Sequence, residues 1–484
     1  AGKTGKRKDL NSNSQTMETE KKGLNLKREV GIIGAVSFIA GTMMGSGIFI
    51  SPQYVLSAIG STGASLVIWA CCGLVVMMGG LCYAELGTVI PESGGEFIYI
   101  LRTVGRVVAF MFVFSFIVIM RPASATGIAL SFAEYVLAPF YSGCIPPQLV
   151  VKCVAAGGII VLAIINCLSV RLATAIQVVS MAVKFLALSV IILGGIVMLF
   201  QGHVENFQNS FEDTNVGVSP VGLALYQGLW CFDGWNTLNY LTEELKHPEV
   251  NLPRAVIIAI SLVTGLYLLV NVSYLTVMTP KELMSSSAVA VTWGNKVLGN
   301  WGWIMSVAAA LSAFGSLNGT FFSGGRVCFV AAREGHMPDI LAMAHVHRLT
   351  PSPALIFTTI VSLIVLIPGD FQSIVNYFSF TAWFFYAITL SGLIYLKIKK
   401  PELPRPYRVP IILPILVVIA AIFLVLAPII DNPQLEYLYV TLFILSGAII
   451  YIPFIHYKIC PGLLTKLTVF LQLFLQVAPA EKNV

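Results

Sequence analysis

The sequence contains few charged residues. Only 11% of its 484 residues are Asp, Glu, Lys or Arg, whereas soluble domains carry about 25%. Hydrophobic residues make up 57% of the chain. This balance excludes a protein whose main solvent is water.

Sequence signatures of enzymes are also missing. All six His residues fall in predicted loops or at the ends of predicted spans, and no zinc-site or serine-nucleophile spacing occurs. Gly2-Lys3-Thr4 resembles the end of a phosphate-binding loop, but the upstream glycine and the preceding strand are missing. We therefore expect no catalytic residue, no metal site and no cofactor.

The chain has instead a series of long apolar runs. Each is roughly 20 residues long, which is enough to cross about 30 Å of hydrocarbon as a helix. The runs are continuous rather than alternating, which favours a helical bundle over a β-barrel. We predict an all-α membrane protein with twelve transmembrane helices, at 31–52, 64–88, 106–136, 149–168, 175–200, 218–241, 253–279, 300–327, 352–369, 371–397, 410–430 and 437–457.

The distribution of Lys and Arg predicts the orientation of these spans. With the N-terminus in the cytoplasm, all but five of the 29 Lys and Arg residues lie on that side. The five are Lys152 at a helix end, Lys281 and Lys296 in outside loops, and Arg121 and Lys184 inside spans. We expect both termini in the cytoplasm, no cleavable signal before the first span, and contact of the basic segments with anionic lipid rather than nucleic acid.

Cysteine usage indicates a partner chain. Most of the nine Cys fall in or beside apolar spans, where small buried packing residues are expected. Cys144 differs, because it lies in the predicted outside loop 141–147 and has no second exposed Cys nearby. An unpaired extracellular thiol predicts an intermolecular disulfide. The sequons at Asn271 and Asn318 lie inside spans, out of reach of glycosylation, which agrees with a glycosylated partner.

Two spans are interrupted at corresponding places. The first breaks at Gly45-Ser46-Gly47 and the sixth at Asp233-Gly234. Because the breaks stand five spans apart, a second five-helix unit enters the membrane from the opposite side, which predicts an inverted repeat with two broken helices facing each other. The predicted units are a tail 1–30, a first repeat 31–200, a second repeat 201–397, helices 11 and 12 in 398–457, and a tail 458–484.

The two breaks offer groups that suit an amino acid. Backbone N–H groups freed at 45–48 favour a carboxylate, and carbonyls at the ends of the preceding half-helices accept from an ammonium. Such a site binds the zwitterion, so specificity must come from contacts with the side chain. The predicted substrate site contains Thr42, Gly45, Ser46, Gly47, Ile48, Trp230, Phe232, Asp233 and Gly234.

Several polar or bulky residues in the spans admit two interpretations. Asp233 can pair with a cationic substrate, or it is a structural Asp bonded to freed backbone N–H groups. Trp230 is an aromatic lid or core packing. Arg121 faces a cavity at a kink or lies nearer an interface, and Glu85 is a helix-end or salt-bridge residue rather than a ligand. Lys184 can reach carbonyls of the broken first helix, and its ammonium can replace a coupling metal ion.

Several motifs resemble the light chains of the heteromeric amino acid transporters. They are the segment 41–52, Tyr83-Ala84-Glu85-Leu86-Gly87, Ser93-Gly94-Gly95-Glu96, Glu243-Glu244-Leu245 and Arg333-Glu334-Gly335-His336. The resemblance spans residues 28–480. Within the family, residues 228–245 look most like the b-zero-plus type, which exchanges cystine and dibasic amino acids for neutral ones without sodium and is linked to the heavy chain rBAT.

The resemblance implies a fold and roles for several residues. The fold is the LeuT-like inverted repeat of the amino acid/polyamine/organocation superfamily. Residues 45–47 and 230–234 match the substrate site, Asp233 the carboxylate for cationic substrates, Lys184 the lysine that replaces sodium, and Cys144 the link to an rBAT-type heavy chain. The substrates implied are cystine, arginine, lysine, ornithine and neutral amino acids, and the location implied is the apical plasma membrane of epithelial cells.

Some features depart from this pattern or favour alternatives. Arg121 stands where the family resemblance leads us to expect Lys, and residues 477–481 match the C-terminal trafficking motif only loosely. Residues 276–304 also resemble the aspartate/glutamate and cystine light chain, although Asp233 argues against it because a carboxylate repels anionic substrates. An ion channel is the rival of a different class, and a membrane enzyme is a third alternative.

Overall fold

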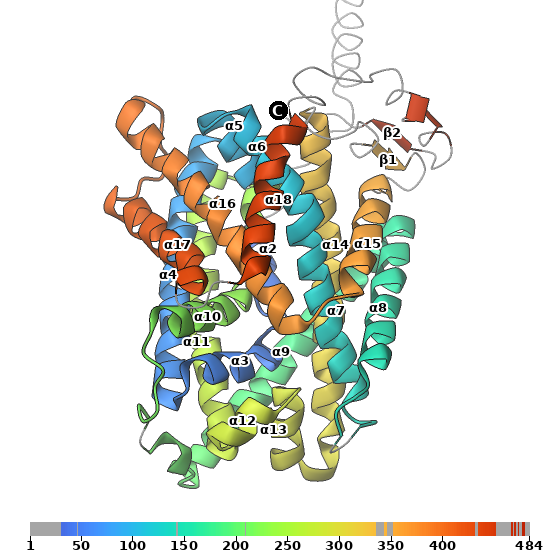
Figure 1. Cartoon of the computed structure of the whole chain (residues 1–484), viewed down its shortest axis with the longest axis vertical. Coiled ribbons are helices and arrows are strands. Elements are labelled where there is room, and N and C mark those ends of the chain that lie inside the picture. Colours follow the sequence, from blue (N-terminus) through green and yellow to red (C-terminus); the bar gives the residue numbers. More distant parts are fainter. Residues whose placement is uncertain are drawn as a thin grey trace, which may run out of the picture.

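The computed structural model describes residues 31–45, 47–141, 144–208, 210–334, 343–345, 352–430 and 434–451, together with residues 466, 467, 469, 470, 473 and 477–479. These residues form a bundle of helices that mostly run along one long axis (Figure 1). The predicted tail 1–30 and most of the predicted tail 458–484 lie outside the described residues.

Eight helices in the described part of the chain are long and apolar enough to cross a membrane. They are α4 (Thr62–Val89), the continuous α6 and α7 (Arg106–Ser115 and Arg121–Leu137), α8 (Gln148–Leu168), α9 (Val170–Phe200), α11 (Pro248–Val277), α14 (Trp303–Arg333), α16 (Phe371–Lys399) and α17 (Ile412–Ile430). Three shorter apolar helices are α2 (Ile32–Met43), α15 (Ser352–Leu366) and α18 (Leu435–Tyr451). The predicted class of helical membrane protein is confirmed, whereas the count of twelve spans stays a prediction.

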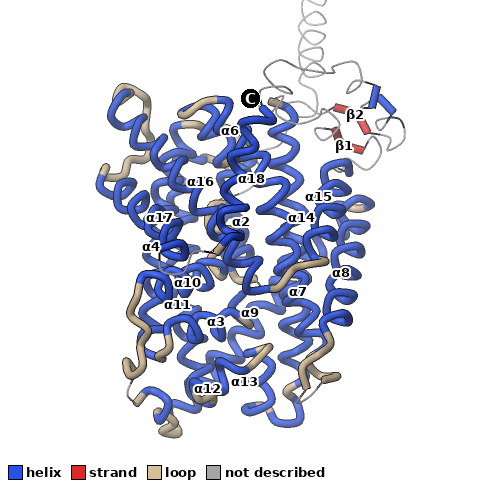
Figure 2. The backbone as a smooth tube through the Cα atoms, in the orientation of Figure 1, coloured by secondary structure: helices blue, strands red, loops and turns tan. Residues whose placement is uncertain are grey.

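The remaining elements are short. They are α3 (Ser51–Ile59), α5 (Glu96–Thr103), α10 (Val218–Trp230), α12 (Pro280–Ser285), α13 (Val289–Val297), the 3₁₀ turns η1 (Gly47–Phe49), η3 (Glu205–Phe207), η4 (Thr237–Glu244) and η5 (Gly299–Trp301), the π turn η2 (Phe116–Met120), and the strands β1 (Met343–His345) and β2 (Val477–Pro479). The two strands pair antiparallel (Figure 2). The strand pair and α5 lie at one end of the bundle, and α12 and α13 lie at the other (Figure 1).

Helices end at both predicted interruptions. α2 ends at Met43 and α3 begins at Ser51, and α10 ends at Trp230 before a turn that leads into η4. The predicted end of the first span at residue 52 is wrong, because α3 continues to Ile59. Pro52 lies in the first turn of α3, where its missing N–H has no helical partner to lose, so it starts a helix here rather than ending one.

Close packing holds the long helices together. Gly80 of α4 faces α11, and a Cβ atom there would lie 2.7 Å from Val256 Cγ1 and 2.8 Å from Ile260 Cδ1. The outer faces carry exposed apolar side chains, such as Leu186 and Leu193 on α9. Helices that bury small residues inside and expose aliphatic residues outside suit a lipid environment, where backbone approach rather than water exclusion drives helix association.

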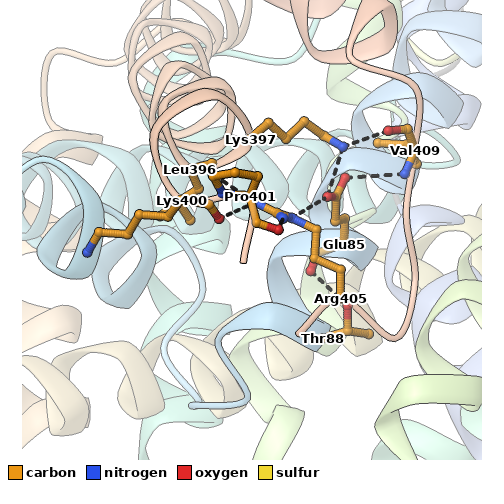
Figure 3. Close-up of polar contacts among 8 residues, drawn as sticks. All are labelled: Glu85, Thr88, Leu396, Lys397, Lys400, Pro401, Arg405 and Val409. Atoms are coloured by element: carbon orange, nitrogen blue, oxygen red, sulfur yellow. Dashed lines mark hydrogen bonds and ion pairs between the residues drawn. The ribbon is translucent and has the colours of Figure 1, made fainter. Parts of the chain in front are cut away.

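A cluster of charges around a buried carboxylate joins α4 to the end of α16 and to the connection that follows it (Figure 3). Glu85 is fully buried, and its Oε1 lies 2.9 Å from Lys397 Nζ and 3.4 Å from Arg405 Nε. The backbone N–H of Val409 donates to Glu85 Oε2 at 3.3 Å. The Arg405 guanidinium also donates to the carbonyl of Leu396 at 2.8 Å. The interpretation of Glu85 as a salt-bridge residue is confirmed.

We expect Glu85→Gln to destabilise the fold. Glutamine keeps the size of the side chain, but it leaves Lys397 and Arg405, whose side chains are only 11% and 6% exposed, without an anion. Removing one partner of a buried ion pair costs about 3–5 kcal/mol. Thermal unfolding of the detergent-solubilised protein should shift to lower temperature. The exposed Glu402, in the same connection, provides the control Glu402→Gln, which should unfold as wild type does. Equal unfolding temperatures for both variants would contradict this account.

Candidate substrate site

A polar pocket lies where the two helix interruptions meet. Its volume is about 50 Å³, which is room for a few water molecules. The residues that line it come from α2 and the first break, α7, α9, the end of α10 and the turn after it, η4 and α14: Gly41, Thr42, Met43, Gly45, Gly47, Arg121, Ser124, Ile128, Gln177, Trp230, Asp233, Gly234, Thr237, Tyr240, Ser316, Gly319 and Thr320.

Most of the predicted site residues line this pocket. Those from the first break are Thr42, Gly45 and Gly47, and those from the second are Trp230, Asp233 and Gly234. Ser46 lies outside the described residues. The structure therefore brings the two predicted half-sites, from opposite halves of the sequence, to a single cavity.

Two predicted site residues do not line the pocket. The Ile48 side chain is buried, and its backbone carbonyl accepts from Tyr274 Oη at 3.2 Å. Phe232 is also buried, with its ring centroid 5.0 Å from that of Tyr267. Both side chains belong to the packing around the breaks, because adjacency to a break in the sequence does not determine the direction of a side chain.

Glycine allows the two breaks to touch. A Cβ atom at Gly47 would lie 2.9 Å from Cys231 Sγ and 3.1 Å from Trp230 Cδ1. Gly234 has φ of 103°, a left-handed conformation that favours glycine, and a Cβ atom there would overlap Thr42. Larger residues at these two positions would push the half-sites apart.

Two side chains satisfy backbone carbonyls that the breaks leave free. Lys184 of α9 is 1% exposed, and its Nζ donates to the carbonyl of Gly41 at 3.0 Å, as the sequence predicted. The Tyr267 hydroxyl of α11 lies within hydrogen-bonding distance of two carbonyls, those of Met43 and Cys231 at 2.5 and 2.7 Å. Because these carbonyls end α2 and α10, one hydroxyl connects both interrupted helices.

The pocket contains one carboxylate and one guanidinium. Asp233 is partly exposed to it, and Arg121 lines it from the start of α7, directly after the π turn η2. The Arg121 guanidinium carbon lies 4.7 Å from the Phe116 ring centroid and 6.0 Å from that of Tyr240. Of the two interpretations of Arg121, the structure supports the cavity-facing cation.

Trp230 both lines the pocket and packs into the core, whereas its role as a lid over the substrate stays a prediction. It lines the pocket, and its ring packs edge-on against Phe371 and Phe378, with centroids 6.2 and 5.3 Å away. Gly127 of α7 lies against the same ring, because a Cβ atom there would lie 3.1 Å from the Trp230 ring. The indole is thus a fixed wall in this structure.

Polar side chains on unbroken helices complete the pocket. The hydroxyls of Ser124 and Ser316 are buried and have no hydrogen-bond partner among the described residues. Both line the pocket, so a bound ligand can satisfy them. Sequence reasoning missed these two serines, and polar residues inside apolar spans were the only signal for them.

A chain of amides orients Gln177 toward the pocket. Asn166 Nδ2 donates to the carbonyl of Leu162 at 2.8 Å and to Asn318 Oδ1 at 2.9 Å. Asn318 Nδ2 donates to the carbonyl of Ala173 at 2.9 Å and to Gln177 Oε1 at 3.2 Å. Backbone carbonyls only accept hydrogen bonds, so they determine which amide atom is which, and Gln177 keeps its NH₂ group as a donor.

Cys144 lies apart from the pocket. It is an exposed free thiol in the connection between α7 and α8. α7 ends and α8 begins toward the end of the bundle that carries α12 and α13 (Figure 1). Cys71 and Cys153 are exposed too, but they lie within the apolar helices α4 and α8. Among the described residues, no group of three or more His, Cys, Asp or Glu side chains is placed to hold a metal ion.

Comparisons with known proteins agree with this arrangement. The amino acid permease family model matches residues 30–454. The chain is 48% identical to b(0,+)-type amino acid transporter 1 of Homo sapiens, over 100% of this chain and 99% of that protein. It is 49% identical to the Oryctolagus cuniculus protein of the same name, over 100% and 99%. It is 42% identical to large neutral amino acids transporter small subunit 2 of Mus musculus, over 85% and 78%.

These relatives are transporters rather than enzymes, and they confirm the resemblance to transporter light chains that the sequence motifs indicated. The family model covers the helices that form the pocket, from α2 to α14, as well as the helices that follow them. The chain therefore belongs to the amino acid permease family.

Proposed function

We propose that the protein is a sodium-independent amino acid exchanger. It imports cystine and cationic amino acids in exchange for neutral ones, as the light chain of a disulfide-linked heterodimer. The observation that carries the proposal is the meeting of both helix breaks in one pocket that contains a carboxylate. The relatives named b(0,+)-type amino acid transporter 1 support the same substrate class across the full chain.

The proposed architecture is a LeuT-like fold of twelve spans, with inverted repeats 31–200 and 201–397. The positions of the interruptions after α2 and α10 support it, because they stand at equivalent places in the two repeats. The uneven distribution of basic residues supports cytoplasmic termini. Exposed Arg102 lies on α5, at the opposite end of the bundle from α12 and α13 (Figure 1), and exposed Arg106 begins α6 directly after it. Exposed Lys399, Lys400 and Arg408 lie at the end of α16 and in the connection to α17.

The substrate would bind through its common groups at the breaks. Its carboxylate faces backbone N–H groups of the segment 45–47, and its ammonium faces carbonyls at the ends of α2 and α10. The side chain then points toward Asp233, which supplies the charge for arginine, lysine and ornithine. The pocket volume of about 50 Å³ holds little beyond the zwitterion, so long side chains require the walls to move apart.

A second candidate is the aspartate/glutamate and cystine transporter light chain. Arg121 is the observation that favours it, because a guanidinium in the pocket attracts anionic side chains. Asp233 in the same pocket opposes it. Uptake of arginine and of glutamate by the same preparation decides between the two, since each charge favours one substrate.

The experiment that tests the main proposal uses the purified protein in proteoliposomes. Labelled arginine and cystine uptake is measured into vesicles that contain neutral amino acid and into empty vesicles. An exchanger takes up label only in preloaded vesicles. An ion channel would instead carry a steady current that does not depend on amino acid on the far side.

Asp233→Asn tests the role of the carboxylate in substrate choice. It keeps the size of the side chain and removes its charge. A hydrogen bond to a charged group contributes about 1.5–3 kcal/mol, so the KM for arginine and lysine should rise roughly ten- to hundredfold. Leucine exchange should change far less, and Asp370→Asn, at the exposed start of α16, serves as the control. Equal losses for arginine and leucine would mean that Asp233 is structural.

Lys184→Ala tests the replacement of sodium by an ammonium. Wild-type uptake should be the same in sodium and choline buffers, because Lys184 already supplies the positive charge next to α2. The variant should lose most of its transport, since the Gly41 carbonyl is left without its donor. Lys281→Ala, at an exposed residue of α12, should transport normally. A strong sodium requirement in the wild-type protein would falsify the proposal.

Cys144→Ser tests the link to a single-span heavy chain of the rBAT type. When the two chains are expressed together, wild type should run on a non-reducing gel as a high-molecular-weight species that the variant lacks. Cys153→Ser removes an exposed thiol on α8 and should leave the species intact. If the species persists in Cys144→Ser, the interchain bond lies elsewhere.

A further inference from the structure

Glu96 is a buried carboxylate at the start of α5, outside the pocket. Its side chain belongs to a residue that is 1% exposed, and it accepts three hydrogen bonds from neutral donors. Tyr240 Oη donates to Oε2 at 2.6 Å, and Tyr83 Oη donates to Oε1 at 3.3 Å. Asn236 Nδ2 also donates to Oε1. No Lys or Arg of the described ranges forms an ion pair with it.

Two of these donors belong to the segment that follows the second break. Asn236 lies in the turn after Asp233, and Tyr240 lies in η4. Tyr240 also lines the pocket, whereas Glu96 does not. Tyr240 therefore links Glu96 to the pocket, because it lines the pocket and its hydroxyl donates a hydrogen bond to the carboxylate.

The backbone around Glu96 fits closely against the same segment. Gly95 has φ of 56°, and a Cβ atom there would overlap the Tyr240 ring. The Gly95 N–H donates to the carbonyl of Asn239 at 3.2 Å. Ser93 and Glu243 exchange two hydrogen bonds, from Ser93 N to Glu243 Oε1 at 3.4 Å and from Glu243 N to Ser93 Oγ at 3.1 Å.

These contacts lie between the pocket and one end of the bundle. The segment 93–103 joins the end of α4 to the start of α6, so it lies at the end where those two helices meet (Figure 1). η4 reaches from the pocket, which Thr237 lines, to this segment, where Glu243 bonds to Ser93. A substrate that leaves the pocket in this direction must separate η4 from α5 or pass beside their contact.

We propose that Glu96 is a positioning residue that holds Tyr240 against the pocket and keeps the pocket closed toward the α5 end. In this proposal, Tyr240 leaves the carboxylate each time the pocket opens to that end. The inference rests on the proposed exchange function, because an exchanger must open its site to both ends in turn.

Tyr240→Phe and Glu96→Gln test the proposal. Each weakens the hydrogen bond between the two side chains, and the first keeps the aromatic ring. Both variants should favour the state that is open at the α5 end. The KM measured from that end should fall and the KM measured from the opposite end should rise, so that the ratio of the two KM values changes by roughly ten- to hundredfold, the effect of losing one hydrogen bond to a charged group.

The two KM values require vesicles of known orientation. Proteoliposomes are sorted by affinity capture of a C-terminal tag, which marks the α5 end because β2 lies there (Figure 1). Exchange of leucine and arginine is measured in tag-outward and tag-inward populations. Tyr99→Phe is the matched control, because Tyr99 lies on α5 and accepts from Asn239 at 2.8 Å but does not line the pocket.

Opposite KM shifts in both variants, with normal values in Tyr99→Phe, would support the proposal. A loss of maximal rate with unchanged KM values would mean that Glu96 only stabilises the fold. Equal KM changes from both ends in Tyr240→Phe, with Glu96→Gln like wild type, would make Tyr240 a substrate contact that is independent of Glu96. Either result overturns the proposal. If wild-type vesicles do not exchange amino acids at all, it is the proposed function that fails.

Discussion

Interrupting a helix inside hydrocarbon leaves backbone N–H and C=O groups without partners, and the arrangement of this site depends on how they are paired. Lys184 satisfies the Gly41 carbonyl, and the Tyr267 hydroxyl lies against the carbonyls that end both α2 and α10. Both side chains come from long continuous helices, α9 and α11. The unwound segments are thus held in place by helices that are themselves intact.

Besides the backbone groups at the breaks, the pocket offers a ligand a limited set of side-chain groups. The hydroxyls of Ser124 and Ser316 have no partner within the described residues, and Gln177 keeps its NH₂ group free of the amide chain that orients it. Asp233 and Arg121 add one charge of each sign. A zwitterion matches such a surface, because the pocket offers a charge of opposite sign for each of its charges and hydrogen-bonding groups for its carboxylate and ammonium.

Sequence reasoning located the two breaks because glycine and an intramembrane carboxylate are strong local signals. Gly45, Gly47, Asp233 and Gly234 all reach the pocket. Lys184 was also recognisable, since a lysine in an apolar span must find acceptors. The extension of the first span into α3 was missed because Ser51 and Gln53 lower the local hydropathy.

The rest of the site depends on tertiary packing that a single sequence does not express. Tyr267 and Gln177 lie on helices without interruptions, and only the packing of α9 and α11 brings them to the breaks. Ile48 and Phe232 adjoin the breaks but turn away from the cavity. Position along the chain predicts the depth of a residue in the membrane, but it does not predict the direction of its side chain.

The unpaired serines have a consequence for the transport cycle of an exchanger. When the transporter switches without substrate from opening to one side of the membrane to opening to the other, it passes through a closed state. In that state the hydroxyls of Ser124 and Ser316 and the two charges of the pocket are buried without a ligand, which costs free energy. A bound amino acid removes this cost, so the conformational change is faster with substrate bound than without it. Flux in one direction is thereby tied to flux in the other, so a concentration gradient of one substrate drives the accumulation of another on the opposite side of the membrane.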